Sequence, residues 1–188
     1  MKKVLLAASI ASALCMANVA QAATGGTITF NGKITDQTCQ VKVNGLSETE
    51  TITLSAVPKS ALGSSGDTAG KSAFTLDLSG CTVATAAYGV TAFFPDNAAN
   101  IDSANKILKN KAATDPAANV GLELLQNIGG TETAVPLGQG SGHVDYKYVT
   151  MAIGDVSKTM NYAVQYKATG VAGAGNVQGV AVYELAYN

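Results

Sequence analysis

The strongest constraint on the fold of this chain is a pair of strand-like segments at its two ends. Residues 28–35 read Ile-Thr-Phe-Asn-Gly-Lys-Ile-Thr, with apolar side chains at Ile28, Phe30 and Ile34 and a glycine, Gly32, in the same alternating row. Residues 182–188 alternate in the same way. A strand places alternate residues on one face, so each end offers an apolar row and a set of backbone donors and acceptors. Both segments therefore need a partner strand.

The first 22 residues have the organisation of a secretory signal. Lys2 and Lys3 precede an apolar stretch that runs to about Ala17, and residues 20–22 read Ala-Gln-Ala, the small-x-small form that signal peptidase cleaves. We therefore predict a signal peptide over residues 1–22. It is too short for a stable membrane span, and we predict no membrane span in the mature chain.

The composition favours a β-rich extracytoplasmic protein. The chain has 20 glycines, no tryptophan and only 13% charged residues, and many of its other residues are Thr, Val and Ala. It contains no arginine, the residue that best recognises phosphate or carboxylate in a bidentate way. The formal net charge of −1 at pH 7 becomes more negative once Lys2 and Lys3 are removed. A nucleic-acid partner is therefore not expected.

The cysteines predict one disulfide. Cys15 lies in the signal, which leaves Cys39 and Cys81 as an even pair in an oxidising compartment. The chain has no CxxC motif and one histidine, His143, so the sequence favours neither a redox centre nor a metal site.

Hydrophobic alternation predicts one antiparallel β-sandwich behind an N-terminal extension. Strands are expected at residues 71–79, 88–94, 120–126 and 159–168, and glycine-rich turns at residues 63–67, 138–142 and 170–175. Residues 101–118 are the one candidate for a helix, which Asp115-Pro116 would close. No internal repeat or further domain boundary is visible.

The sequence gives little support for catalysis. Ser103 and Lys106 form a Ser-x-x-Lys pattern, but the other motifs of penicillin-recognising enzymes are absent. His143 has no second histidine or cysteine beside it, and the glycine clusters lack the spacing and lysine of a phosphate loop. We predict a protein that is not an enzyme and binds no cofactor.

Four features together resemble the chaperone-usher pilins, in particular the major shaft subunits of type 1-like fimbriae. These features are an N-terminal extension carrying Phe30-Asn31-Gly32, a first cysteine soon after it, a second cysteine following a strand, and a C-terminal end with a glycine, Gly175, and a penultimate tyrosine, Tyr187. The resemblance covers the whole mature chain, and the order of the motifs makes it specific.

The resemblance implies an incomplete immunoglobulin-like β-sandwich that is completed by donor-strand complementation from a neighbouring subunit. Residues 39–188 would form the pilin domain, and residues 23–38 the extension that inserts Ile28, Phe30, Gly32 and Ile34. The groove strand would present Gly175, Val177, Gly179, Ala181, Tyr183, Leu185 and Tyr187.

It also implies the partners and the location. The subunit would bind a periplasmic chaperone, pass an outer-membrane usher, and join neighbouring subunits in a homopolymer. It would be exported through the periplasm to a fimbrium on the cell surface, where it would be a structural subunit supporting cell adhesion.

Two alternatives stay open at this point. Residues 28–35 could be an ordinary first strand of their own sandwich, in a monomeric secreted or periplasmic protein that binds a small ligand. A tip adhesin is the other alternative, although such a protein usually carries a separate lectin domain for which this chain has no room.

Overall fold

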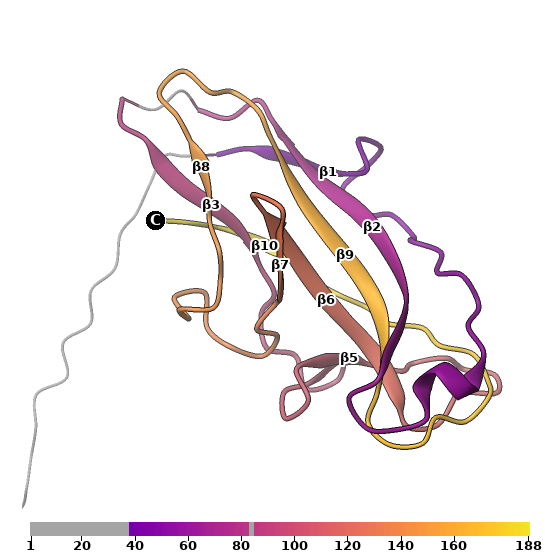
Figure 1. Ribbon diagram of the computed structural model, residues 1–188. Helices are drawn as coiled ribbons and strands as arrows, with labels where there is room; N and C mark the ends of the chain where they lie inside the picture. Colours follow the sequence, from indigo (N-terminus) through magenta and orange to yellow (C-terminus); the bar gives the residue numbers. More distant parts are fainter. Residues whose placement is uncertain (1–37, 83–84) are drawn as a thin grey trace, which may run out of the picture. The chain divides into compact units, whose positions relative to one another are not determined.

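The computed structural model of the protein describes residues 38–82 and 85–188 (Figure 1). These residues belong to one unit, Thr35–Asn188. The expected signal peptide and the alternating row from Ile28 to Ile34 lie outside the described residues.

Antiparallel strands dominate the described residues, which contain one short 3-10 helix, η1 (Lys59–Leu62). The strands are β1 (Gln40–Val43), β2 (Thr68–Ser79), β3 (Tyr88–Phe93), β4 (Ile101–Asp102), β5 (Ile107–Lys109), β6 (Val120–Ile128), β7 (Thr131–Ala134), β8 (Val149–Met151), β9 (Lys158–Ala168) and β10 (Glu184–Tyr187). The expected all-β class is confirmed, with each of the four predicted strands matched by β2, β3, β6 or β9.

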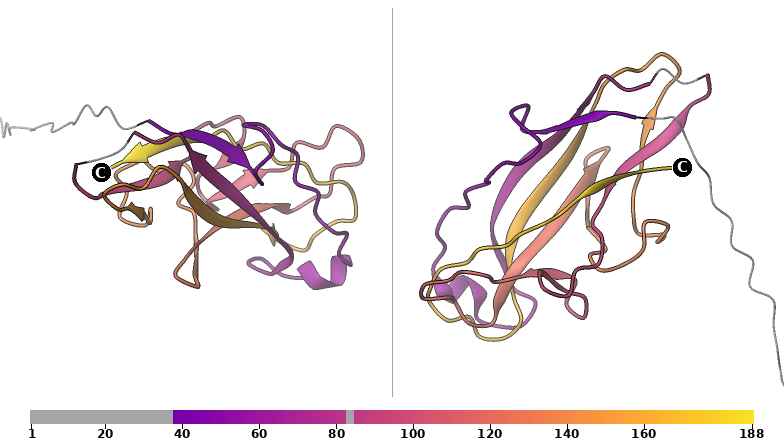
Figure 2. Two further views of the ribbon diagram at one scale, coloured as in Figure 1. Left: turned by 90° about the horizontal axis from the view of Figure 1, so that it is seen from above. Right: turned by 180° about the vertical axis from the view of Figure 1, so that it is seen from behind.

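The strands form two sheets. The larger one has the order β1-β2-β9-β6-β5-β4, with β7 paired to β6, and the smaller one has the order β10-β3-β8. Seen from behind in Figure 2, the C-terminal segment that ends in β10 crosses over β9 and β6 of the larger sheet. Paired strands of the smaller sheet therefore cover only part of the larger sheet, and the chain before β10 lies over another part of it.

The larger sheet is built around the long pairing of β2 with β9. Phe74 lies opposite Tyr162 and Leu76 opposite Met160 in this register, and the rings of Phe74 and Tyr162 stack with their centroids 5.6 Å apart. These side chains are buried, whereas their neighbours on β2, such as Thr75, are only half-buried. Alternation in the sequence thus becomes one core face and one outer face.

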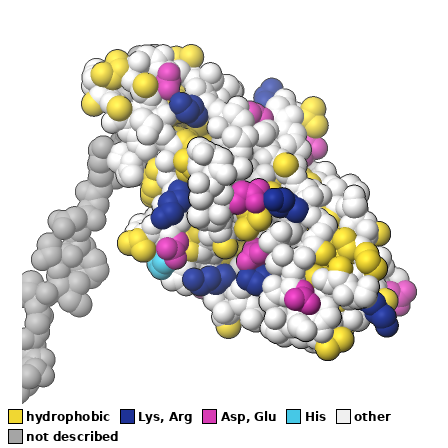
Figure 3. All heavy atoms as spheres, in the orientation of Figure 1, with side chains coloured by type: hydrophobic (Ala, Val, Ile, Leu, Met, Phe, Trp, Pro, Cys, Tyr) yellow, Lys and Arg dark blue, Asp and Glu magenta, His cyan; other side chains and the backbone are white. Residues whose placement is uncertain are grey.

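Opposite charges pair on the outer face of the larger sheet. The Lys71 ammonium lies 2.8 Å from the Glu132 carboxylate, and the Lys167 ammonium lies 2.6 Å from the carboxylate of Glu123. Figure 3 shows basic and acidic side chains next to one another on the side of the molecule seen in Figure 1. The charged outer face can therefore be exposed to solvent, whereas the apolar face of the same sheet has to be buried.

A buried glutamine fixes the loop between β7 and β8. Gln126 on β6 is 3% exposed. Its side-chain nitrogen donates to the Lys147 carbonyl oxygen at 2.7 Å and lies 3.2 Å from the hydroxyls of Thr91 and Tyr162, while its oxygen accepts from the Lys147 amide. The side-chain amide therefore pairs with Lys147 as a neighbouring strand would, and no polar atom of Gln126 lacks a partner.

The helix expected over residues 101–118 is wrong. The segment contains β4 and β5, joined by a turn in which the Asp102 carboxylate accepts from the backbone amides of Ala104 and Asn105 at 3.1 Å. Lys106 then adopts φ 55°, the left-handed region. Local bonds from an Asp side chain to the backbone favour a turn over a helix, and in this segment they decide the outcome.

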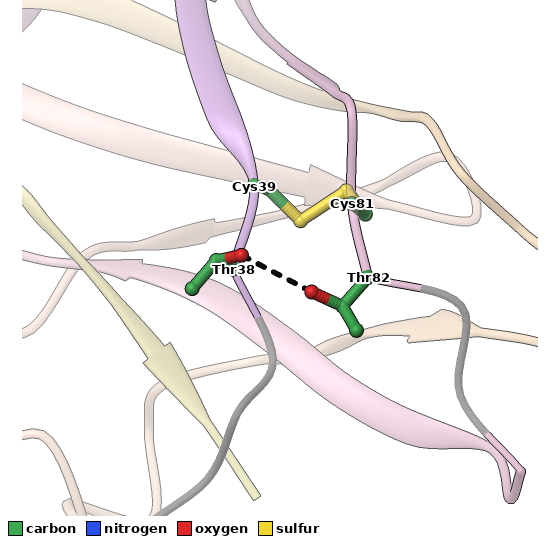
Figure 4. The surroundings of a disulfide bond; sticks show 4 residues. All are labelled: Thr38, Cys39, Cys81 and Thr82. Atoms are coloured by element: carbon green, nitrogen blue, oxygen red, sulfur yellow. Dashed lines mark hydrogen bonds between the residues drawn. A yellow bond between two sulfur atoms is a disulfide. The ribbon is translucent and has the colours of Figure 1, made fainter.

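The predicted disulfide between Cys39 and Cys81 is present (Figure 4). It links the start of β1 to the end of β2, which are already paired from Gln40 with Ser79 to Val43 with Leu76. Beyond the disulfide, the Thr82 amide donates to the Thr38 carbonyl oxygen at 2.9 Å, and the two threonine hydroxyls lie 3.1 Å apart. The β1–β2 pairing therefore continues past the covalent link.

Replacing both Cys39 and Cys81 by serine should lower the free energy of unfolding by about 2 to 5 kcal/mol, because the cross-link constrains the unfolded chain. Urea unfolding of the variant and the parent protein, followed by circular dichroism, measures the difference. Equal midpoints and slopes for the two proteins would contradict a stabilising role.

The fold also predicts a specific loss of stability at high pH. Burial raises the pKa of the Tyr162 hydroxyl to about 12 from an ordinary value of 10.0. The folded state therefore holds this proton more tightly than the unfolded state, so the stabilisation is complete below pH 10 and is lost as the pH rises to about 12.

Tyr162→Phe should reduce the loss of unfolding free energy at alkaline pH by up to about 2.7 kcal/mol. This figure follows from the rise of the pKa from 10.0 to about 12, because each pKa unit corresponds to about 1.36 kcal/mol. The variant should be less stable at neutral pH, because Ala92 and Gln126 lose a partner. Denaturant unfolding at several values between pH 8 and 12 separates the two effects. If the unfolding free energy of Tyr162→Phe fell with pH above 10 as steeply as that of the parent protein, Tyr162 would not be the cause of the alkaline loss.

Candidate strand-binding interface

The C-terminal segment exposes one row of side chains and half-buries the other. Residues 177–187, which we call the C-terminal rim, alternate in burial from Val177 onward. The half-buried members of the inner row are Val177, Gly179, Tyr183, Leu185 and Tyr187, and the exposed members of the outer row are Gln178, Val180, Val182 and Glu184; Ala186, on the outer row, is half-buried. Ala181 belongs to the inner row by position but is exposed.

The rim has hydrogen-bonded neighbours at its two ends and none in the middle. At its C-terminal end β10 pairs with β3, and at its start the Lys111 amide donates to the Gln178 carbonyl oxygen at 2.7 Å. Among the described residues, no backbone hydrogen bond joins residues 179–183 to another segment. β10 is also the edge strand of its sheet, so one side of the rim is left unpaired.

Asn110 holds the start of the rim in place. Its side-chain nitrogen donates to the carbonyl oxygens of Ala117 at 3.0 Å and Asn176 at 2.8 Å. Its side-chain oxygen accepts from the Gln178 amide at 3.0 Å. One side chain therefore replaces several rungs of a missing backbone ladder.

Gly175 lies where the chain enters this rim and has φ 149°, a conformation that favours glycine. A Cβ at this position would meet the Asp115 carbonyl oxygen and would lie 2.6 Å from the Ala117 nitrogen. The backbone of residues 115–117 therefore leaves no room for a side chain. Gly179 differs, because a Cβ there would lie 2.8 Å from the Cδ1 atom of the Leu122 side chain.

A second segment without backbone pairing lies in residues 48–57, which we call the N-terminal rim. Ile52 and Leu54 are half-buried and contact the main core, while Thr51, Thr53 and Ser55 are exposed. No backbone hydrogen bond ties residues 50–57 to another described segment. The rim is thus extended, amphipathic and unpaired.

The two rims run side by side in opposite directions. The Tyr183 hydroxyl donates to the Glu48 carbonyl oxygen at 2.9 Å, which joins them near one end. Near the other end, Val57 and Val177 both pack against the same small core cluster. Both rims also contact the main core, with Leu54 and Leu185 among the contacting side chains.

The tyrosines of the C-terminal rim have perturbed pKa values. Burial raises the pKa of Tyr183, and the nearby Glu48 carboxylate raises it further. Burial also raises the pKa of Tyr187, although a hydrogen bond from the Cys39 backbone partly offsets the rise. The ring of Tyr187 lies 6.0 Å from that of Tyr88. Both hydroxyls stay protonated at physiological pH and serve as neutral hydrogen-bonding groups.

The described residues contain no group of three or more His, Cys, Asp or Glu side chains placed to hold a metal ion. The Ser103 hydroxyl donates to the Asp96 carboxylate at 3.4 Å, and His143 lies 3.6 Å from the Asp145 carboxylate at the surface. The chemistry available at the rims is main-chain hydrogen bonding and burial of apolar side chains.

Residues 54–188 match the family described as FimA: Type-1 fimbrial protein, A. The chain belongs to the type-1 fimbrial protein family. It is 42% identical over 164 residues to an F17 fimbrial protein of Escherichia coli, which covers 86% of this chain and 87% of that protein. It is 33% identical over 178 residues to the major fimbrial subunit SMF-1 of Stenotrophomonas maltophilia (strain K279a), which covers 93% of this chain and 99% of that protein.

Solved structures show the same fold. The P pilus rod subunit superposes with a TM-score of 0.52 at 17% identity, over 80% of this chain and 99% of that chain. A chaperone-usher pilus subunit superposes with a TM-score of 0.51 at 16% identity, over 87% and 96% of the two chains. The fimbrial chain thus has the incomplete immunoglobulin-like fold of pilus rod subunits, as the resemblance implied.

Family membership confirms the predicted class of function. The protein is a structural, non-enzymatic subunit of a chaperone-usher fimbria, and it is located in the fimbria on the cell surface. None of the described residues forms a helix with the length and hydrophobicity that a membrane span requires.

Sequence reasoning missed the N-terminal rim. The residues that it overlooked are Glu48, Ile52 and Leu54, although residues 51–55 alternate polar and apolar side chains in the sequence. That alternation, read with the strand period of two, was the signal that could have found them. Asn110 carried no such signal, because its role depends on two segments that are distant in the chain.

The two glycines of this region should respond differently to substitution by alanine. Gly175→Ala should lower the free energy of unfolding by about 1 to 3 kcal/mol or more, because the conformation is strained and backbone atoms block the new methyl group. Gly179→Ala should cost about 1 kcal/mol, since the Leu122 side chain can move. Denaturant melts of both variants measure the difference. Equal losses would contradict this account of Gly175.

Proposed function

We propose that this fimbrial subunit polymerises by strand exchange, in which residues 23–38 of one subunit insert between the two rims of the next. The observation that supports this proposal is the pair of antiparallel, amphipathic rims that make no backbone hydrogen bond to each other while packing on one core. An extended segment placed between them would find unpaired donors and acceptors on both sides. Residues 39–188 then act as the domain, and residues 1–22 as the signal.

The apolar row of the extension fits this role energetically. Ile28, Phe30 and Ile34 would each contribute about 1.5 to 3 kcal/mol when fully buried. The main-chain ladder would fix the register, and donor-strand complementation of pilins is itself a standard example of such β-strand addition. Dissociation would have to expose the whole row at once, so the fibre should be kinetically stable.

The same rims account for a chaperone and an usher as partners. An unpaired strand edge with half-buried apolar side chains is prone to aggregation until it is covered. In this proposal a periplasmic chaperone covers the rims during export, the outer-membrane usher brings the next subunit, and its extension replaces the chaperone. Support of cell adhesion then follows from the length of the fibre.

The monomeric alternative makes the opposite use of the N-terminal segment. There residues 28–35 would dock on their own domain, and the protein would bind a small ligand instead of another subunit. Membership in a family of fimbrial subunits favours strand exchange over this monomeric alternative. The variant Gly32→Val separates strand exchange from the monomeric alternative experimentally.

Gly32→Val should block assembly and leave folding intact. In a donor strand this position faces a crowded core, where an added side chain typically costs about 1 to 3 kcal/mol. Fibres seen by electron microscopy should become rare or short, and chaperone-bound subunit should accumulate. Asn31→Val is the matched control, because the neighbouring residue points to the opposite face of the strand, and it should assemble normally.

Tyr187→Ala should act at an earlier stage. Tyr187 is half-buried in the C-terminal rim, so its loss should reduce the chaperone-bound pool itself. Normal fibres from Gly32→Val, or loss of the folded subunit in that variant, would falsify the assignment of residues 28–34 as a donor strand.

A further inference from the structure

One tyrosine side chain joins the two rims in place of a backbone ladder, and a second joins the C-terminal rim to the residue just before β1. Tyr183 donates its hydroxyl hydrogen to the Glu48 carbonyl oxygen at 2.9 Å. The Tyr187 hydroxyl receives a hydrogen bond from the backbone of Cys39, just before β1. Both tyrosines lie on the inner row of the C-terminal rim, and both partners are backbone groups of the N-terminal part of the domain.

The length of the connection between Tyr183 and Glu48 indicates how far apart the two rims lie. Adjacent strands in a sheet lie about 4.8 Å apart, and at that distance the rims would bond directly through their backbones. They do not, as residues 50–57 and 179–183 have no backbone partner among the described residues. An extended tyrosine side chain followed by a hydrogen bond spans roughly two such spacings, which is the separation of two strands that flank a third.

We infer that Tyr183 is a positioning residue that holds the rims one strand-width apart, so that the domain keeps room for an incoming strand. This inference rests on the proposed strand exchange and specifies what keeps the acceptor open. The hydroxyl bond fixes the Tyr183 ring between the rims, where its bulk resists their approach; without that bond the ring can turn away and no longer blocks closure. The apolar residues Ile52 and Leu54 could then approach Leu185 and bury their surface against it.

The effect on strand uptake follows from population arithmetic. If only the open arrangement accepts a strand, the apparent affinity falls in proportion to the fraction that is open. Tyr183→Phe keeps the aromatic ring and removes only the hydroxyl. It should therefore slow the binding of a strand without removing a side chain that contacts the core.

The chain offers a matched control in Tyr148. Its hydroxyl donates to the Ser141 carbonyl oxygen at 3.0 Å, in a loop that belongs to neither rim. Tyr148→Phe therefore removes the same type of bond from another part of the domain. Both variants should lower the melting temperature slightly and to a similar extent, so a difference between them in strand uptake cannot arise from stability alone.

The first measurement uses the exported, disulfide-bonded chain and a fluorescent synthetic peptide of residues 24–36. We expect the association rate of the peptide to fall about tenfold in Tyr183→Phe and to change less than twofold in Tyr148→Phe. A rate for Tyr183→Phe equal to that of the parent protein would overturn the inference.

The second measurement reports the separation of the rims without any peptide. Thr53→Cys and Val182→Cys place two spin labels on exposed positions of the two rims, and the native Cys39 and Cys81 are occupied by their disulfide. Continuous-wave EPR should show stronger dipolar broadening when Tyr183→Phe is added, and no change with Tyr148→Phe. Identical spectra for the Tyr183→Phe variant and the parent would overturn the inference.

The two measurements separate the inference from the proposed function. If the parent protein does not bind the peptide but its rims approach each other in Tyr183→Phe, strand exchange fails while the positioning role of Tyr183 stands. If the parent binds the peptide and the spectra of Tyr183→Phe do not change, strand exchange stands and the positioning role fails.

Discussion

The rest of this structure depends on one constraint: some backbone amide and carbonyl groups at the rims find no hydrogen-bonding partner within the subunit. The C-terminal rim is paired on one side only, through β10 and β3, and the N-terminal rim has no backbone partner among the described residues. Burying an unpaired amide or carbonyl is costly, so both rims stay near the surface although their inner rows are apolar. Family membership explains why such an arrangement persists, since a fimbrial subunit is made to join another chain.

The rest of the domain compensates for the missing strand with side chains and one covalent link. Asn110 replaces rungs of the ladder at the start of the C-terminal rim, and Gln126 does the same for the loop at Lys147. The disulfide fixes the β1–β2 pairing at the end nearest to the N-terminal extension. Polar side chains of this kind are fully satisfied, so they specify one arrangement at little cost in stability.

The sequence revealed the elements whose patterning is local. Alternation at Phe74, Leu76 and Leu78 identified β2, and the same rule identified the inner row that ends at Tyr187. The helix expected over residues 101–118 was wrong, because Asp102 stabilises a turn there through its own side chain. The strand order and the contact of Tyr183 with Glu48 depend on residues far apart in the chain, and periodicity carries no information about such pairs.

The position of the disulfide matters most for a subunit that gives one strand and accepts another. A contact in which the extension of one copy meets the rims of the next is heterologous and does not close, so it builds a fibre. In such a fibre, tension enters each domain through the residues just before Cys39. The covalent bond to Cys81 passes that tension directly to β2, whose long pairing with β9 is the centre of the larger sheet. A short strand such as β1, held by its hydrogen bonds alone, would be the first to peel away under load. The disulfide removes that weak point at the place where the proposed donor segment joins the domain.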